Sequence, residues 1–318
     1  MSQALIEFDS PWKNVLETFF EDFMIFFFPQ IHKDINWTRG YEFLDKELQK
    51  VVRDAITKER RVDKLVKVWR KNGKQALLYI HIEVQGQFDA EFEERVFIYH
   101  YRLYDRYGPN VVSLAILGDD NKAWLPQRYS YDNFACRLSF EFPVVKLLDY
   151  VKKWEELERS NNPFSIVVRT HLKGLETMGS SKQRYHWKVE LCKALYEANY
   201  SKKEILELYR FLDWVLALPK RLTRQFDDFI EEYEEGKKVE YVTSIERRGI
   251  EKGRQLGVLQ RSQEYVVDIL DTRFENVPNT LVKTIQAIED KSLLSQLHRE
   301  AIFVDSVELF EKQLKNKQ

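Results

Sequence analysis

Cysteine is scarce in this sequence, and neither sign of charge is in excess. The 318 residues include 2 cysteines, Cys136 and Cys192, which cannot build a disulfide framework and lack the spacing of metal ligands. This usage predicts a protein of the reducing cytoplasm. The formal net charge is -1, so no global charge indicates a nucleic-acid or membrane partner.

The segments that mark membrane proteins, exported proteins and nucleotide-dependent enzymes are missing too. The apolar run Met24–Phe28 is too short to span a bilayer and follows two acidic residues. The first basic residue, Lys13, also follows two acids, so no signal peptide is expected. There is no glycine-rich phosphate loop and no Gly-x-Ser-x-Gly nucleophile motif. We therefore expect no membrane partner and no nucleotide cofactor.

The sequence does have ample apolar residues for a core, at 44% of the chain, and they recur with two periods. Helices are predicted over 11–28, 41–55 and 91–107, and strands over 61–71, 76–85 and 110–117. Asn72-Gly73 is a strong signal for a hairpin turn between the first two strands. The connection from Gln85 to Val111 is long enough for a right-handed helical crossover between parallel strands.

Beyond Pro143 the pattern is helical. Helical spacing recurs in 144–157, 185–197 and 202–218, and a more charged helix continues it through Leu222–Tyr233. Glycines at 249, 253 and 257 indicate either a hinge or close helix contact, or a solvated linker. In a last unit, Pro278 is expected to begin a helix.

Two acidic residues fall inside the predicted hairpin. Asp63 lies near the start of one strand and Glu83 inside the next, and counting from the turn puts them nearly opposite each other. Opposed carboxylates repel unless a cation lies between them. With Gln85 on the face of Glu83, the set supplies the hard oxygen ligands that Mg²⁺ or Mn²⁺ prefers. The alternative is that both acids lie on the solvent face of the hairpin, with Lys64 and Lys67 as partners.

The order of elements and the Asp…Glu-x-Gln pattern resemble the PD-(D/E)XK nuclease fold, whose last position is usually Lys. The sequence is more closely similar to the recombination-promoting nuclease family, also described as transposase-like. That similarity is carried by EFLDKELQKVVRDAITKERRVDKLVKV, LLYIHIEVQGQ, FEERVFIYHYRLYDRYG and the Gly/Glu/Arg-rich stretch ERRGIEKGRQLG. It continues through a short C-terminal helical domain of unknown function and so covers most of the chain.

The resemblance implies an α/β fold: a PD-(D/E)XK-like core, a mixed sheet flanked by helices, followed by a largely α-helical C-terminal half. The expected segments are a nuclease core at 1–140, a helical extension at 141–218, a charged helical linker at 219–262 and a small C-terminal helical domain at 263–318.

The implied function is that of a metal-dependent DNA endonuclease acting in recombination, transposition or defence. Asp63 and Glu83 would bind Mg²⁺ (or Mn²⁺), and Gln85 would position the water that attacks the phosphodiester. Gln85 can donate a hydrogen bond but carries no charge where the superfamily usually has Lys, which fits a slow or specialised nuclease. The competing interpretation is a catalytically decayed nuclease fold that acts as a DNA-binding or protein-interaction scaffold.

A basic stretch surrounds the first acid, with 10 Lys or Arg against 3 Asp or Glu from Lys50 to Lys74. Such a stretch attracts a phosphate backbone. The expected DNA contacts are Arg60, Arg61, Lys64, Arg95, Tyr99 and Arg102. The last three share one helical face, whose alternative role is a core edge with Arg95 paired to Glu91.

Two accessory residues and a dimer complete the expectations. Glu47 is a candidate additional metal ligand, or else a solvated helix acid, and His81 is a candidate neighbour of the metal, or else a packed strand histidine. A homodimer is expected from the apolar stripe in Leu222–Tyr233 and from an aromatic face, because both exceed what a peripheral helix needs. The aromatic face consists of Phe19, Phe20, Phe23, Phe26 and Phe27.

Overall fold

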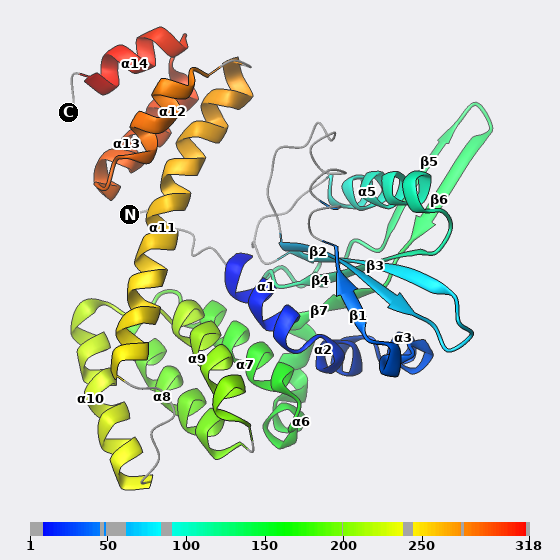
Figure 1. Ribbon diagram of the computed structural model, residues 1–318, viewed down its shortest axis with the longest axis horizontal. Coiled ribbons are helices and arrows are strands. Elements are labelled where there is room, and N and C mark those ends of the chain that lie inside the picture. The colour runs from blue at the N-terminus through cyan, green and yellow to red at the C-terminus, as the bar shows by residue number, and fades with distance from the viewer. Residues whose placement is uncertain are drawn as a thin grey trace. The chain divides into compact units, whose positions relative to one another are not determined.

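The structure is a computed structural model that describes residues 9–44, 48, 62–83, 91–198, 200–237, 244–274 and 277–315, of which 9–10, 62–63, 80–83, 244–248, 250–256 and 315 are described by their backbone alone. The chain forms two compact units, Met1–Tyr241 and Val242–Gln318 (Figure 1). The first is mixed α/β around a five-stranded sheet, which confirms the predicted α/β class.

The sheet has the strand order β1-β2-β3-β4-β7. β2 (Val62–Trp69) and β3 (Gln75–Glu83) form the predicted antiparallel hairpin. β4 (Val111–Leu117) lies parallel to β3, and β7 (Val144–Lys146) lies parallel to β4. α5 (Phe92–Tyr107) makes the crossover from β3 to β4, as expected, and ends at Gly108, whose φ of 81° favours glycine.

Helices cover both faces of this sheet (Figure 1). α5 packs on one face, while α1 (Asp9–Thr18) and α2 (Phe20–Phe27) lie on the other. Under α5, one apolar cluster joins Leu103 to the amino ends of β3 and β4, and a second joins Phe92 to the carboxyl end of β4. α5 therefore runs antiparallel to β3 and β4, and its first turns lie over their carboxyl ends.

One helix prediction near the amino terminus is wrong, and a second is wrong at its start, since Leu48, the one described residue of 45–55, is helical. A single helix over 11–28 is replaced by α1 and α2, which are separated at Phe19. The helix predicted from residue 41 begins instead as β1 (Tyr41–Phe43), an edge strand antiparallel to β2. The rings of Tyr41 and Phe43 pack 4.7 and 5.7 Å from that of Phe20, so tertiary aromatic contacts override the helical spacing.

The aromatic face that suggested a dimer is part of the core. Phe19, Phe20, Phe23 and Phe27 are at most 6% exposed. Phe23 also packs 5.3 Å from the ring of Phe164, which belongs to the helical part of the same unit. This face therefore gives no support to a dimer.

The segment from residue 118 to 146 contains strands that the sequence pattern did not predict. β5 (Arg128–Asn133) and β6 (Cys136–Glu141) form a separate two-stranded sheet. β7 and the 3-10 helix η2 (Leu147–Lys153) replace most of the helix predicted over 144–157.

The remaining elements of both units are helical. In the first unit they are α3 (Pro29–Asp34), η1 (Trp37–Arg39), α6 (Trp154–Arg159), α7 (Pro163–Glu176), α8 (Ser181–Glu197), α9 (Lys202–Val215) and α10 (Lys220–Lys237). The second unit contains α11 (Ser244–Phe274), α12 (Asn279–Gln286), α13 (Lys291–Phe303) and α14 (Val307–Lys315). Pro278 precedes α12 as predicted, and α11 continues through all three spaced glycines. Among the helices in the described ranges, none is both long and apolar enough to cross a bilayer.

Candidate active site

The hairpin holds the two acids in a diagonal relationship. The backbone of Asp63 pairs with that of His81, so Glu83 lies two residues further along β3 than an opposite position. The prediction that the two acids lie nearly opposite each other is therefore wrong, and the geometry of the turn is the reason. The amide of Gly73 (φ 82°) donates to the carbonyl of Arg70 at 2.9 Å, so three residues rather than two connect the strands.

Positions 63, 81 and 83 nevertheless lie on one face of the sheet. Strand residues alternate between faces, so these positions share the face of Leu65 and Tyr79, which pack in the cluster under α5. Cα atoms in such a diagonal relationship are about 7–8 Å apart. The register therefore brings the positions of Asp63, His81 and Glu83 together beneath α5.

Two side chains of α5 are buried over this face. Arg95 is 5% exposed and Tyr99 is 2% exposed, and the ring of Tyr99 packs edge-on against Tyr79 at 5.9 Å. The guanidinium of Arg95 lies 5.5 Å from the ring of Phe92, at the end of α5 nearest the carboxyl ends of β3 and β4. Because an arginine cannot lose its proton in a protein, this burial places a permanent positive charge above the face that carries the acidic positions.

Lys64 does not belong to this face. It is 3% exposed and forms an ion pair with Glu17 of α1 on the opposite side of the sheet, so its predicted role in binding DNA is not supported. Lys67 forms an ion pair with Glu42. The lysines invoked as partners of Asp63 and Glu83 thus both pair with acids of other elements.

Of the remaining predicted site residues, the structure places Arg102, which is half-buried on α5. Gln85, Arg60, Arg61 and Glu47 lie outside the described residues. Within the side chains that the structure does describe, no group of three His, Cys, Asp or Glu could hold a metal ion.

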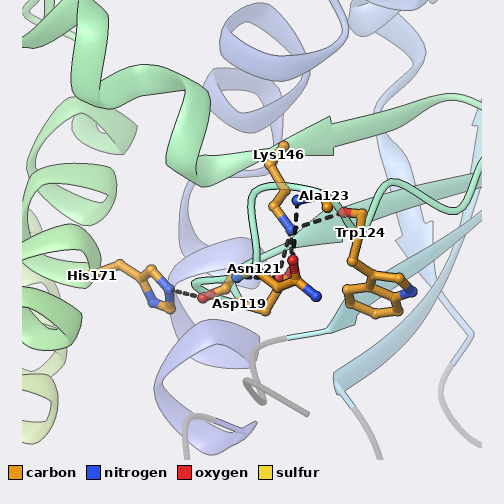
Figure 2. A network of polar contacts seen from close by, with 7 residues as sticks. Asp119, Asn121, Ala123, Trp124, Lys146 and His171 are labelled. Atoms are coloured by element: carbon orange, nitrogen blue, oxygen red, sulfur yellow. Dashed lines mark hydrogen bonds and ion pairs between the residues drawn. The ribbon is translucent and has the colours of Figure 1, made fainter. Parts of the chain in front are cut away.

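A second polar cluster lies at the carboxyl ends of the parallel strands (Figure 2). Lys146, at the end of β7, donates to both carboxylate oxygens of Asp119 at 2.6 Å and to the carbonyl of Trp124 at 3.0 Å. Asp119 also accepts from the amide of Asn121 at 2.9 Å. Asp119 is 1% exposed and Lys146 is 5% exposed, so the pair is almost fully removed from water.

His171 of α7 joins the same loop from the other side (Figure 2). Its Nε2 lies 2.7 Å from the carbonyl oxygen of Gly118, which can only accept, so Nε2 carries the hydrogen. Burial lowers the pKa of His171 to about 4, although the carbonyl of Gly118 and the charge of Asp119 oppose that shift. His171 is therefore neutral near pH 7.

This second cluster has the character of an anchor rather than a reaction centre. Its carboxylate and ammonium groups satisfy each other and are closed to solvent. In the sheet register Lys146 pairs with Leu117, and Leu117 pairs with Glu83. The anchor therefore stabilises the end of the sheet that also carries the acidic positions. The sequence pattern missed it. Its only local signal is the polar sequence Gly118-Asp119-Asp120 directly after a buried strand.

Comparisons of the chain with protein-family models, with curated proteins and with solved structures find no match.

Proposed function

We propose that the protein is a metal-dependent DNA endonuclease whose active site lies between the β2–β3 hairpin and α5. The proposal rests chiefly on Arg95. A guanidinium buried over positions 63 and 83 requires anionic surroundings, and two carboxylates and a phosphodiester all meet that need.

The donor chemistry at these positions suits a hard divalent cation. Two carboxylates in diagonal positions on one face can share a cation with water and substrate oxygens, which is how Mg²⁺ is usually held. When bound, Mg²⁺ or Mn²⁺ polarises a phosphoryl oxygen and lowers the pKa of a water. Asp63 and Glu83 would hold that ion.

The other residues would orient the reactants. The amide of Gln85 would hold the attacking water, while Arg95 and Tyr99 would fix the carboxylates and offset phosphate charge. The water oxygen forms a bond to phosphorus as the bond from phosphorus to O3′ breaks. The leaving oxygen takes up a proton, so the ends are a 3′-hydroxyl and a 5′-phosphate. Arg60, Arg61 and Arg102 are the proposed contacts to the phosphate backbone of the DNA.

One observation favours a second candidate, a non-catalytic scaffold that binds DNA or protein. Gln85 supplies no positive charge near the scissile phosphate, and such charge usually contributes to stabilising the transition state. In this scaffold Arg95 would pair with Asp63 and Glu83 as a structural charge cluster.

Plasmid nicking with Mg²⁺ separates the two candidates. Asp63→Ala and Glu83→Ala are each expected to abolish nicking. The stabilisation that added Mg²⁺ gives the wild type should disappear in both variants. Asp105→Ala removes an exposed acid of α5 and serves as the matched control, with nicking unchanged.

The scaffold predicts the opposite pattern. The wild type would not nick DNA, and calorimetry would detect no binding of Mn²⁺. Gln85→Lys adds the commoner residue of the superfamily, so it should retain or increase nicking in an active nuclease. If the two alanine variants nick DNA as fast as the wild type, the catalytic assignment is wrong.

A further inference from the structure

A two-stranded arm formed by β5 and β6 projects from the first unit beside α5 (Figure 1). The pairing of Asn133 with Cys136 leaves a two-residue turn, Phe134-Ala135, at its tip. The base of the arm is held against α5, where the hydroxyl of Tyr129 donates to Glu94 at 3.3 Å. The tip itself is the most exposed part of this ribbon.

The turn at the tip is strained. Phe134 and Ala135 have φ angles of 48° and 66°, the left-handed conformation that two-residue hairpin turns require. Asn and Gly usually occupy such positions because a bulky side chain disfavours positive φ. The side chain of Phe134 is nevertheless 100% exposed. A strained backbone that holds a large apolar ring in water suggests a contact outside the fold.

A surface that could bind such a ring lies on the same chain. An aromatic row, consisting of Tyr101, Phe97, Tyr129 and Tyr131, runs from the outer face of α5 onto β5. Phe97 and Tyr129 stack at 5.0 Å with planes 19° apart, and Phe97 lies 6.4 Å from Tyr101. Tyr101 is 56% exposed and Tyr131 is 42% exposed, so the row is open to a partner at both ends.

The charges of the arm favour a protein partner over a polyanion. Its two arginines pair with its two carboxylates: Arg137 with Asp132 at 2.8 Å, and Arg128 with Glu141 at 4.0 Å. A phosphate backbone would meet as many carboxylates as guanidinium groups. With two charges of each sign the arm is neutral, so a second copy of the arm meets no net repulsion.

We propose that the arm joins two copies of this chain, with Phe134 of each copy seated on the aromatic row of the other. A twofold arrangement makes this exchange reciprocal, because the same ring and the same row meet twice. Aromatic residues and arginine are the side chains most enriched at the energetic centres of protein interfaces. The proposal is independent of the nuclease assignment.

Phe134→Asn tests the ring without disturbing the turn, because Asn tolerates a positive φ. Sedimentation equilibrium of the full chain should show a dimer of the wild type at micromolar concentration. The dissociation constant of the variant should rise at least about tenfold, since a buried Phe is removed twice per dimer. Ala135→Gly is the control, because it relieves the turn and keeps the ring, and its dimer should be as tight as that of the wild type.

A cross-link tests where the ring sits. Cys136, next to the tip, is exposed and Cys192 is buried, so Tyr101→Cys introduces one reactive partner in the aromatic row. Under a mild oxidant, this variant should form a covalent dimer on a non-reducing gel, whereas the wild type, which has Cys136 but no thiol in the row, should not. Adding Cys136→Ser should abolish the dimer.

Three outcomes would overturn the proposal. They are a wild type that is monomeric throughout the micromolar range, a Phe134→Asn dimer as tight as the wild type, and the absence of a covalent dimer from Tyr101→Cys. Weaker DNA binding by Phe134→Asn with unchanged dimerisation would also overturn it and would assign the tip to nucleic acid.

Discussion

Several charged side chains of the first unit are almost fully buried, and their partners come from distant parts of the chain. Lys146 pairs with Asp119, 27 residues away, and Lys188 donates to Asp213 at 2.5 Å, 25 residues away. A buried pair adds little stability over an apolar equivalent, but removing one partner costs about 3–5 kcal/mol. These pairs therefore fix which elements meet, more than they add to the total stability.

The buried histidine of the anchor makes the stability of the first unit depend on pH. His171 has a pKa of about 4 in the fold, against about 6.5 in an unfolded chain. As pH falls below about 6.5, the unfolded chain binds a proton that the folded chain does not bind. The free energy of unfolding therefore decreases until about pH 4. From this group alone, the free energy of unfolding should be about 2 kcal/mol lower at pH 5 than at pH 7.

Urea denaturation of wild type and His171→Gln at both pH values measures that contribution. Gln can still donate to the carbonyl of Gly118, so the variant should lose the part of the pH dependence that His171 contributes and keep the contact. His186→Gln removes an exposed histidine of α8 and should leave the pH dependence as in the wild type. Parallel pH profiles for wild type and His171→Gln would contradict the assignment of a depressed pKa.

At the scale of elements, the packing of α7 on α9 in the first unit depends on a close approach between the two helices. α7 and α9 pack together where Gly174 faces Val215, and a Cβ on Gly174 would lie 2.6 Å from Cγ1 of that valine. A contact of that length is not tolerated, and valine is stiff about χ1, so the helices would have to separate. The absence of a side chain at Gly174 thus sets the spacing of this helix pair.

Gly174→Ala should therefore destabilise the first unit, although alanine is the better helix former. Overpacking costs about 1–3 kcal/mol, whereas the gain in helix propensity is about 1 kcal/mol. Thermal unfolding should show a lower melting temperature for Gly174→Ala. Adding Val215→Ala removes the clashing methyl groups, so the double variant should be more stable than the sum of the two single changes implies. Gly236→Ala, in α10 of the same unit, is the matched control and should not destabilise, because a Cβ there meets nothing within 4 Å.

At the scale of the whole molecule, the nearly neutral chain has a dense run of positive charge between residues 50 and 74. The formal net charge is -1, yet residues 50–74 carry 10 basic against 3 acidic side chains. If DNA binds there, affinity comes from the release of counterions rather than from the metal. Binding should thus survive chelation of Mg²⁺ and weaken as salt is added.

Charge reversal at Arg60 and Arg61 should lower DNA affinity uniformly across sequences. The slope of log affinity against log salt should become shallower by about 0.9 for each phosphate of duplex DNA that the protein no longer neutralises. Fluorescence anisotropy over a salt series measures both effects. The comparison variant reverses Lys202 and Lys203, which are exposed at the start of α9. A larger effect there would move the DNA path to the helical part of the unit.

The sequence by itself determined those elements whose signals are local. Alternating apolar residues around Asn72-Gly73 predicted the β2–β3 hairpin, and helical spacing over 91–107 predicted α5. The length of the connection from Gln85 to Val111 predicted a strand parallel to β3. A period of two or 3.6 needs no knowledge of distant residues, so these predictions depended on short stretches alone.

Only the tertiary structure decided the features that depend on distant partners. Tyr41 and Phe43 form a strand because they pair with β2 and pack on Phe20. The helical spacing of their own segment does not indicate either interaction. The turn geometry at Gly73 moved Glu83 from opposite Asp63 to a diagonal position. The anchor of Asp119, Lys146 and His171 exists because three separate elements bring their charges and dipoles out of water together, and an isolated buried charge would be unstable in any of them.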